Sequence, residues 1–127
     1  MILPDGVLLI DVTVVHPASP SNQMTRPLAT SVSAEKKKRT KYGDYARMRG
    51  ATILGFALET FGALGPDART VVQRLEVAAA ASAVDPSRFS RKLVTQTISV
   101  ALQKGNALVT RGGLLTTRAA ALDGRAE

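Results

Sequence analysis

A run of apolar residues near the start of the chain predicts a buried strand. From Val7 to Val15 every residue is Val, Leu, Ile or Thr, with the single exception of Asp11. A near-continuous run of this kind is typical of a strand covered on both faces of a sheet. Pro4-Asp5-Gly6 before it is a turn signal, and the segment 16–27 after it, rich in Pro and Ser, predicts a loop.

The carboxylate of Asp11 stands out inside so apolar a segment. An ionised carboxylate buried without a partner is so unfavourable that it normally neutralises, pairs with a cation or binds a metal. On a strand, Asp11 and Thr13 point to the same face. Two interpretations of Asp11 therefore stay open: a functional ligand, or the partner of a cation from elsewhere in the chain.

Periodicity predicts three helices and one further strand along the rest of the chain. The expected elements are a helix over 28–48, a strand over 51–58, a helix over 67–83 and a helix over 86–104. Asp85 is the expected N-cap of the last helix, and Gly105-Asn106 its expected end. Its expected inward face consists of Phe89, Leu93, Thr97, Val100 and Ala101.

This order of elements predicts an α/β fold, with a small central sheet flanked by helices. Only two or three strands are visible, which is few for a stable sheet, so we expect a first strand to be missing upstream. Residues 1–110 form the predicted domain, and the Ala- and Arg-rich segment 111–127 is expected to be a flexible tail.

Composition narrows the possible chemistry. The 127 residues include no cysteine and one histidine, His16, which excludes disulfides, zinc–thiolate sites, cysteine nucleophiles and multi-histidine metal sites. No apolar run reaches the ~18 residues of a membrane span, and the N-terminus lacks the basic segment of a signal peptide. We therefore expect a soluble, intracellular protein without a small-molecule cofactor.

The charge of the chain favours polyanionic partners. Lys and Arg number 17 against 10 Asp and Glu, a net charge of +7, which points to nucleic acid before acidic membrane. A solvated basic surface is the alternative. In the densest basic run, Glu35, Lys38 and Tyr42 share one face of the predicted helix. The cations that turn to solvent or phosphate are Lys36, Lys37 and Arg39.

Glu59 follows the second apolar run, where the predicted strand ends. An acid at the C-terminal end of a strand is a usual place for function in an open α/β sheet. The same position fits a carboxylate that caps the next helix. Both interpretations of Glu59 stay open.

Asp11 in its Ile-Asp-Val-Thr-Val strand and the later run Lys38-Arg39-Thr40-Lys41-Tyr42 together show a resemblance to a known family. They resemble the restriction-like endonuclease domain of non-LTR (LINE-type) retrotransposons, within the wider PD-(D/E)XK nuclease fold. There a Pro-Asp motif, a strand Asp and a Lys-x-x-Lys-Tyr motif form the site. The segments 11–17, 56–65 and 99–107 also resemble the C-terminal ends of reverse-transcriptase-like proteins.

The resemblance implies metal-assisted phosphodiester hydrolysis of target DNA in the nucleus. Carboxylates of the family hold Mg²⁺ or Mn²⁺, which polarises the phosphate and lowers the pKa of an attacking water. A lysine beside the metal stabilises the developing charge. Carried over to this chain, Asp11 is the metal ligand. The implied catalytic residues are Lys38, Lys41, Tyr42 and Glu59, and the implied nucleic-acid contacts are Lys36, Lys37 and Arg39.

Two departures from the family pattern bear on activity. Position 13 is Thr, where many PD-(D/E)XK enzymes have the catalytic Lys, so Lys38 takes that role in the resemblance. Asp5 and Asp11 on one extended strand would lie about 20 Å apart, too far to share a metal. Pro4-Asp5-Gly6 is therefore expected to be a hairpin turn, with the true first acid upstream of Met1.

Three functions stay open on the sequence alone. The first is a metal-dependent DNA endonuclease, and the second is a non-catalytic nucleic-acid-binding remnant that contacts phosphates through its basic helix. The third is an interaction module whose basic residues form only a solvated surface. A carboxylate within about 5 Å of Asp11 would favour the first, and exposed lysines without such an acid the second. An exposed apolar patch would favour the third.

Overall fold

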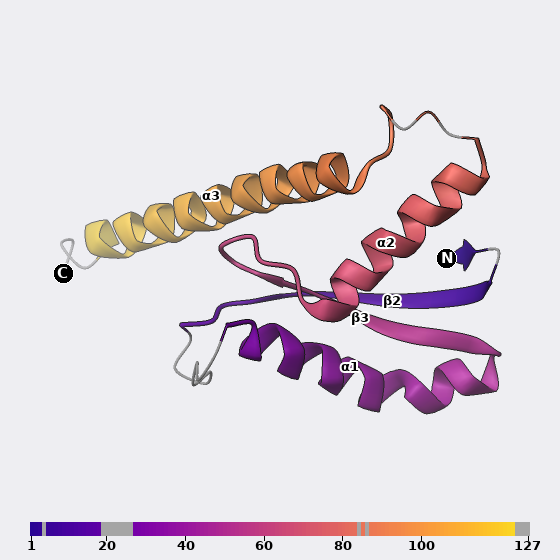
Figure 1. Cartoon of the computed structure of the whole chain (residues 1–127). Coiled ribbons are helices and arrows are strands. Elements are labelled where there is room, and N and C mark those ends of the chain that lie inside the picture. The colour runs from indigo at the N-terminus through magenta and orange to yellow at the C-terminus, as the bar shows by residue number, and fades with distance from the viewer. Residues whose placement is uncertain (4, 19–26, 84, 86, 124–127) are drawn as a thin grey trace.

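The computed structural model describes residues 1–3, 5–18, 27–83, 85 and 87–123, and it has an α/β fold. Three strands and three helices make up the described chain (Figure 1). Their bounds are β1 Ile2–Leu3, β2 Gly6–Val15, α1 Ala29–Met48, β3 Ala51–Glu59, α2 Pro66–Ala81 and α3 Arg91–Asp123. The expected small sheet flanked by helices is therefore present.

The sheet has the order β1-β2-β3. β1 pairs antiparallel with the start of β2, and β2 pairs in parallel with β3 from Val7 to Val15. In this register Asp11 lies opposite Gly55, and Val15 lies opposite Glu59. Because α1 connects the two parallel strands, β2, α1 and β3 form a βαβ unit.

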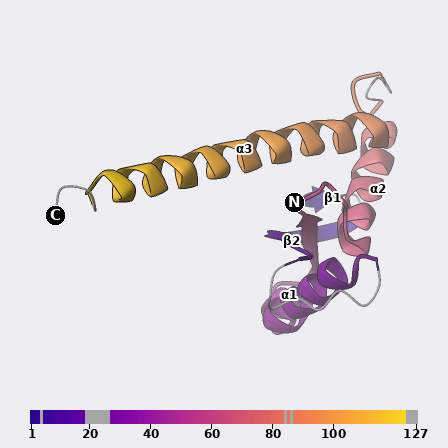
Figure 2. The same ribbon diagram turned by 90° about the vertical axis from the view of Figure 1, so that its left-hand side faces the viewer.

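Alternating residues of β3 face two different helices, which lie on opposite sides of the strand pair (Figures 1 and 2). Phe56 and Leu58 pack with Val71 and Val72 of α2 in the main apolar core. The side toward α1 carries Gly55, where an added Cβ would come 2.8 Å from the Cα of Glu35. The absence of a side chain at this position is what allows α1 to lie so close to the sheet.

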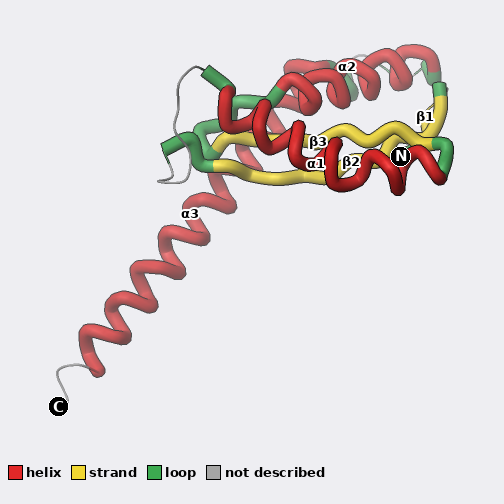
Figure 3. The backbone as a smooth tube through the Cα atoms, turned by 90° about the horizontal axis from the view of Figure 1, so that it is seen from below, coloured by secondary structure: helices red, strands yellow, loops and turns green. Residues whose placement is uncertain are grey.

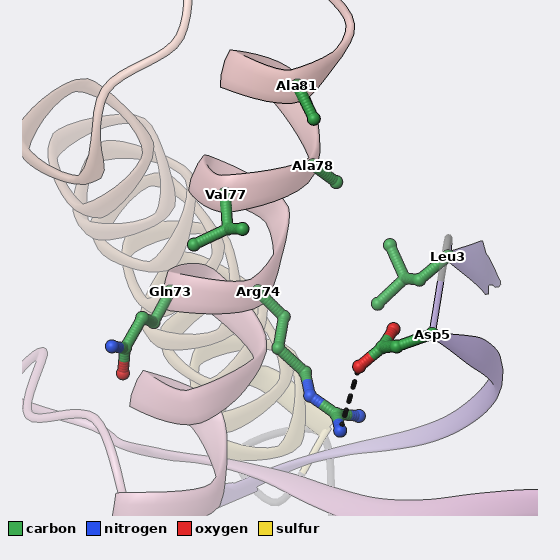
Figure 4. A pocket seen from close by; sticks show the side chains of 7 residues that line it. All are labelled: Leu3, Asp5, Gln73, Arg74, Val77, Ala78 and Ala81. Carbon is green, nitrogen blue, oxygen red and sulfur yellow. Dashed lines mark ion pairs between the residues drawn. The ribbon is translucent and has the colours of Figure 1, made fainter.

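The predicted hairpin turn before β2 is confirmed by the β1–β2 pairing, in which Ile2 lies opposite Val7 and Leu3 opposite Gly6. Pro4 itself lies outside the described residues. An ion pair of 3.2 Å between Asp5 Oδ2 and Arg74 joins this hairpin to α2, beside an apolar hollow of about 320 Å³ (Figure 4). The buried Leu3 lines the same hollow.

The expectation that β2 is covered on both faces is wrong for its second half. Val12 is 60% exposed and Val14 is 50% exposed. These two side chains lie on the sheet face that carries α2, but α2 packs against β3 and does not extend over the end of β2. An apolar surface on β2 is therefore left open.

The last helix differs from its prediction at both ends. Asp85 accepts the N–H of Ser87 at 2.8 Å in a turn, and α3 begins later, at Arg91. It then continues through Gly105 and Gly112 to Asp123, so the expected end at Gly105 is wrong. Pro86 and residues 124–127 lie outside the described residues, and the rest of the predicted tail, 111–123, is helical. An isolated glycine costs a helix only about 1 kcal/mol, which good helix formers around it offset.

The inward face of α3 is also different from the predicted one. Val94 and Ile98 pack against the core, whereas Leu93 and Val100 of the predicted face are exposed. Both sides of this helix carry apolar residues, so periodicity alone does not select the buried one. No helix among the described residues has the length and apolar character needed to cross a membrane.

Candidate functional site

Asp11 and Lys38 meet between β2 and α1. The alternation of β2 turns Asp11 toward α1, and the Nζ atom of Lys38 lies 2.9 Å from its Oδ2 atom. The side chains are 28% and 26% exposed, so the ion pair is accessible to solvent on one side. Lys38 is thus the cation that pairs with the carboxylate of Asp11 in this apolar strand.

Lys41 and Tyr42 lie one turn further along α1. The Nζ atom of Lys41 is 5.0 Å from the centre of the Tyr42 ring, within the range of a cation–π contact. A hydrogen bond with Tyr42 and the charges of Tyr42 and Asp11 raise the pKa of Lys41 above its ordinary value. Of the Lys-x-x-Lys-Tyr residues, Lys38 contacts Asp11 directly, whereas Lys41 contacts Tyr42 and stays charged at neutral pH.

A hollow of about 220 Å³ lies between β2 and α1, and Lys38 of this ion pair lines it. Three hydroxyl-bearing residues, two lysines and two small apolar residues line it: Thr13, Thr30, Ser33, Lys37, Lys38, Val15 and Ala34. Hydroxyl and ammonium groups are hydrogen-bond donors that suit a phosphate oxygen. The hollow therefore has the chemistry of an anion-binding surface.

The remaining basic residues of the motif point away from the sheet. Lys36, Lys37, Arg39 and Lys41 are all exposed. Arg39 pairs with Asp67 at the start of α2. Of the ion pairs formed within the described residues, none involves Lys36, Lys37 or Lys41. Three positive charges on α1 are thus available to an external anion.

Glu35 has a structural role that the sequence pattern does not reveal. Its side chain is fully buried, and its carboxylate accepts the N–H groups of Asp67 at 2.9 Å and Ala68 at 3.1 Å. These are the free amides of the first turn of α2, where a negative charge is favourable. Burial nevertheless dominates and raises the pKa of Glu35 above 4.5. No local pattern connects Glu35 with a helix so much later in the chain, so the sequence carries no signal of this contact.

Glu59 is buried as well, but it does not join Asp11. Its carboxylate accepts the hydroxyl of Ser31 at 2.9 Å. Because Glu59 lies opposite Val15, four positions beyond Asp11, the two acids are separated by about 13 Å along the strands. The alternative interpretation, a carboxylate that caps the next helix, is wrong for Glu59, since Glu35 occupies that place.

The described residues do not form a complete metal site around Asp11. They contain no group of three or more His, Cys, Asp or Glu side chains that would hold a metal ion. Asp5 is engaged with Arg74, Glu35 with the start of α2, and Glu59 with Ser31. Mg²⁺ and Mn²⁺ require a larger set of oxygen ligands than one carboxylate beside a lysine, so the described residues at this place do not fit either metal.

Comparison with known proteins identifies no family for this chain. No protein-family model, curated protein or solved structure matches the chain. The site is therefore interpreted from its own geometry: an accessible Asp11–Lys38 pair, an adjoining hollow lined by hydroxyls, and exposed lysines on α1.

Proposed function

We propose that the chain is a nucleic-acid-binding domain of the restriction-endonuclease-like kind, derived from a retroelement, which contacts the phosphates of DNA through α1. The observation that carries the proposal is the position of Lys37 and Lys41. These two exposed lysines lie one turn apart on the same side of α1, and no ion pair within the described residues neutralises them. The phosphate backbone supplies much of the affinity of proteins for DNA, through contacts of this kind.

The charge balance of α1 supports a phosphate-binding role. The helix carries six basic residues, Lys36, Lys37, Lys38, Arg39, Lys41 and Arg47, and only two acids. One of those acids, Glu35, is buried, and the other, Asp44, pairs with Arg47. The solvent side of α1 is therefore strongly positive, and it attracts a polyanion over a distance limited by salt screening.

The hollow beside Asp11 gives the basic surface a place for one phosphate. Thr13, Thr30 and Ser33 carry hydroxyl groups, and Lys37 offers a positive charge that no ion pair within the described residues neutralises. Contacts of this type position a protein on DNA without reading its sequence. The proposal therefore predicts DNA binding with little sequence preference and a strong dependence on salt.

Salt dependence of binding to a short DNA duplex, measured by fluorescence anisotropy, tests the proposal. Each lost phosphate contact lowers the slope of log affinity against log salt by about 0.9. Replacing Lys37 and Lys41 together by Ala should lower the slope by about 2. The matched control replaces Arg88 and Lys92, two exposed bases outside α1, and should leave the slope unchanged. A flat salt response of the unaltered chain, or equal losses in both variants, would contradict the proposal.

Phosphodiester hydrolysis is the second candidate function, and the closeness of Asp11 and Lys38 favours it. The resemblance implies Mg²⁺ or Mn²⁺, but the described residues supply only one carboxylate at this place. Nicking of supercoiled DNA, with and without each metal, tests this candidate. Asp11→Ala should abolish any metal-dependent nicking, and nicking that survives this substitution would exclude Asp11 from the reaction.

A further inference from the structure

The second half of α3 extends beyond the α/β body (Figures 1 and 3). Its large apolar residues are exposed. Leu108, Leu115 and Leu122 are between 59% and 68% exposed. Large apolar side chains that form a continuous exposed surface mark a site of interaction. The proposed DNA-binding surface on α1 makes no use of these residues.

Bases and leucines alternate along this side of α3. The order is Lys104, Leu108, Arg111, Leu115, Arg118 and Leu122, with spacings of four, three, four, three and four residues. Leucines that recur every seven residues follow the period of a coiled coil. The bases recur with the same period, so they form one positive flank beside the leucines.

Small residues lie next to the leucines on the same side. Gly105, Gly112 and Ala119 each come three residues before a leucine. A Cβ added at Gly105 or Gly112 would meet no atom within 4 Å. Small residues at such positions let the backbone of a second helix approach closely, whereas a lipid surface gains nothing from them.

An apolar hollow of about 470 Å³ lies at the base of α3, on the side of the helix that faces the sheet. Val14 and Leu58 line it from the sheet, and Leu102, Gly105 and Val109 line it from the helix. The exposed end of β2 thus forms the floor of a groove whose wall is α3.

We infer that the leucine side of α3 binds an amphipathic helix of a partner protein, whose apolar stripe is flanked by acidic residues. The charge of the flank selects this occupant, because Lys104, Arg111 and Arg118 need carboxylates across the interface. A second copy of the chain would bring only the same bases, since Asp123 is the one acid that α3 contains. An acidic membrane is less suited, since α3 has no aromatic residue to anchor it.

Binding of a designed helical peptide to the full chain tests this inference. The probe repeats Leu at the heptad positions a and d and carries Glu on its flanks, and a control peptide carries Lys in place of Glu. Fluorescence anisotropy should show saturable binding of the Glu peptide and none of the Lys peptide. Leu115→Ser should weaken the binding about tenfold, because it removes a central apolar contact. The change lies in an exposed position, and circular dichroism verifies that the helix persists.

Charge reversal provides the sharper measurement. Replacing Arg111 and Arg118 together by Glu should exchange the preference, so that the Lys peptide binds and the Glu peptide does not. Equal binding of both peptides by the unaltered chain would overturn the inference. So would absence of binding at millimolar peptide, dimerisation of the chain through Leu115, or binding of phosphatidylserine vesicles in preference to the Glu peptide. These results do not depend on DNA binding by α1, which Lys37 and Lys41 test separately.

Discussion

Gly65 and Glu35 lie so close together that a Cβ on Gly65 would collide with the carboxylate of Glu35. This contact brings the loop before α2 against α1, in a position where the carboxylate meets the first amides of α2. Glu35 and Gly65 thereby join the two helices that cover opposite sides of β3. The stability of the unit that carries the proposed site depends on this junction.

Gly65→Ala should destabilise the protein by about 1–3 kcal/mol, since the added methyl overpacks a buried position. Gly65 has a φ of −65°, a conformation that alanine adopts readily, so the loss is steric. Gly43→Ala is the matched control, because a Cβ there meets no atom within 4 Å. Within α1 it should stabilise the helix by about 0.5–1 kcal/mol. Urea unfolding measures both changes, and equal effects of the two substitutions would contradict the packing explanation.

The raised pKa of Glu35 predicts how stability depends on pH. Burial favours the protonated form in the folded state and outweighs the N–H donors of Asp67 and Ala68, which act in the opposite direction. Protonated Glu35 therefore contributes stability fully below pH 4.5, and the contribution disappears as pH rises through the folded-state pKa.

Comparison with Glu35→Gln isolates this contribution, because the other titrating groups are common to both proteins. The difference in unfolding free energy, wild type minus variant, should fall as pH rises above 4.5. The pKa values of Glu76 and Asp85 are lowered by hydrogen bonds and change stability in the opposite direction. They cancel in the comparison. A difference that rises with pH would mean that the pKa of Glu35 is depressed.

Local pattern is sufficient to predict most elements of the fold. The apolar runs of β2 and β3, and the helices α1 and α2, follow from periodicity, because one face of each is buried. The prediction fails for α3, whose glycines have the pattern of a helix end. Its 33 residues remain helical because the helix formers between the glycines offset their cost.

Only part of the site follows from the sequence. The alternation of the strand and the face of the helix predict where Asp11 and Lys38 point, and their ion pair lies where these two patterns meet. The roles of Glu35 and Glu59 depend on which segments of the chain contact each other in the folded protein. The spacing of residues in the sequence does not predict these contacts. Both carboxylates are buried and hydrogen-bonded, and stabilise the βαβ unit without joining Asp11.

Ser31→Ala should destabilise the protein by about 1–3 kcal/mol, because it leaves the buried carboxylate of Glu59 without this hydrogen bond. Ser33→Ala, an exposed neighbour on the same helix, is the control and should change stability by no more than about 0.5 kcal/mol. Thermal unfolding monitored by circular dichroism measures both. A loss from Ser31→Ala that persists unchanged when Glu59 is replaced by Met, which has no acceptor oxygen, would show that the hydrogen bond is not its cause.

Asp11→Asn should strengthen DNA binding in the absence of divalent metal. Asp11 neutralises Lys38 at 2.9 Å, so its removal leaves Lys38 free to contact a phosphate beside Lys37. The salt slope should then rise by about 0.9. Stability should change by less than about 1 kcal/mol, since the pair is partly exposed. The combined variant Asp11→Asn with Lys38→Met should return the slope to that of the unaltered chain. Weaker binding by Asp11→Asn would instead mean that Asp11 itself contacts the nucleic acid, and that Lys38 serves only to hold it in place.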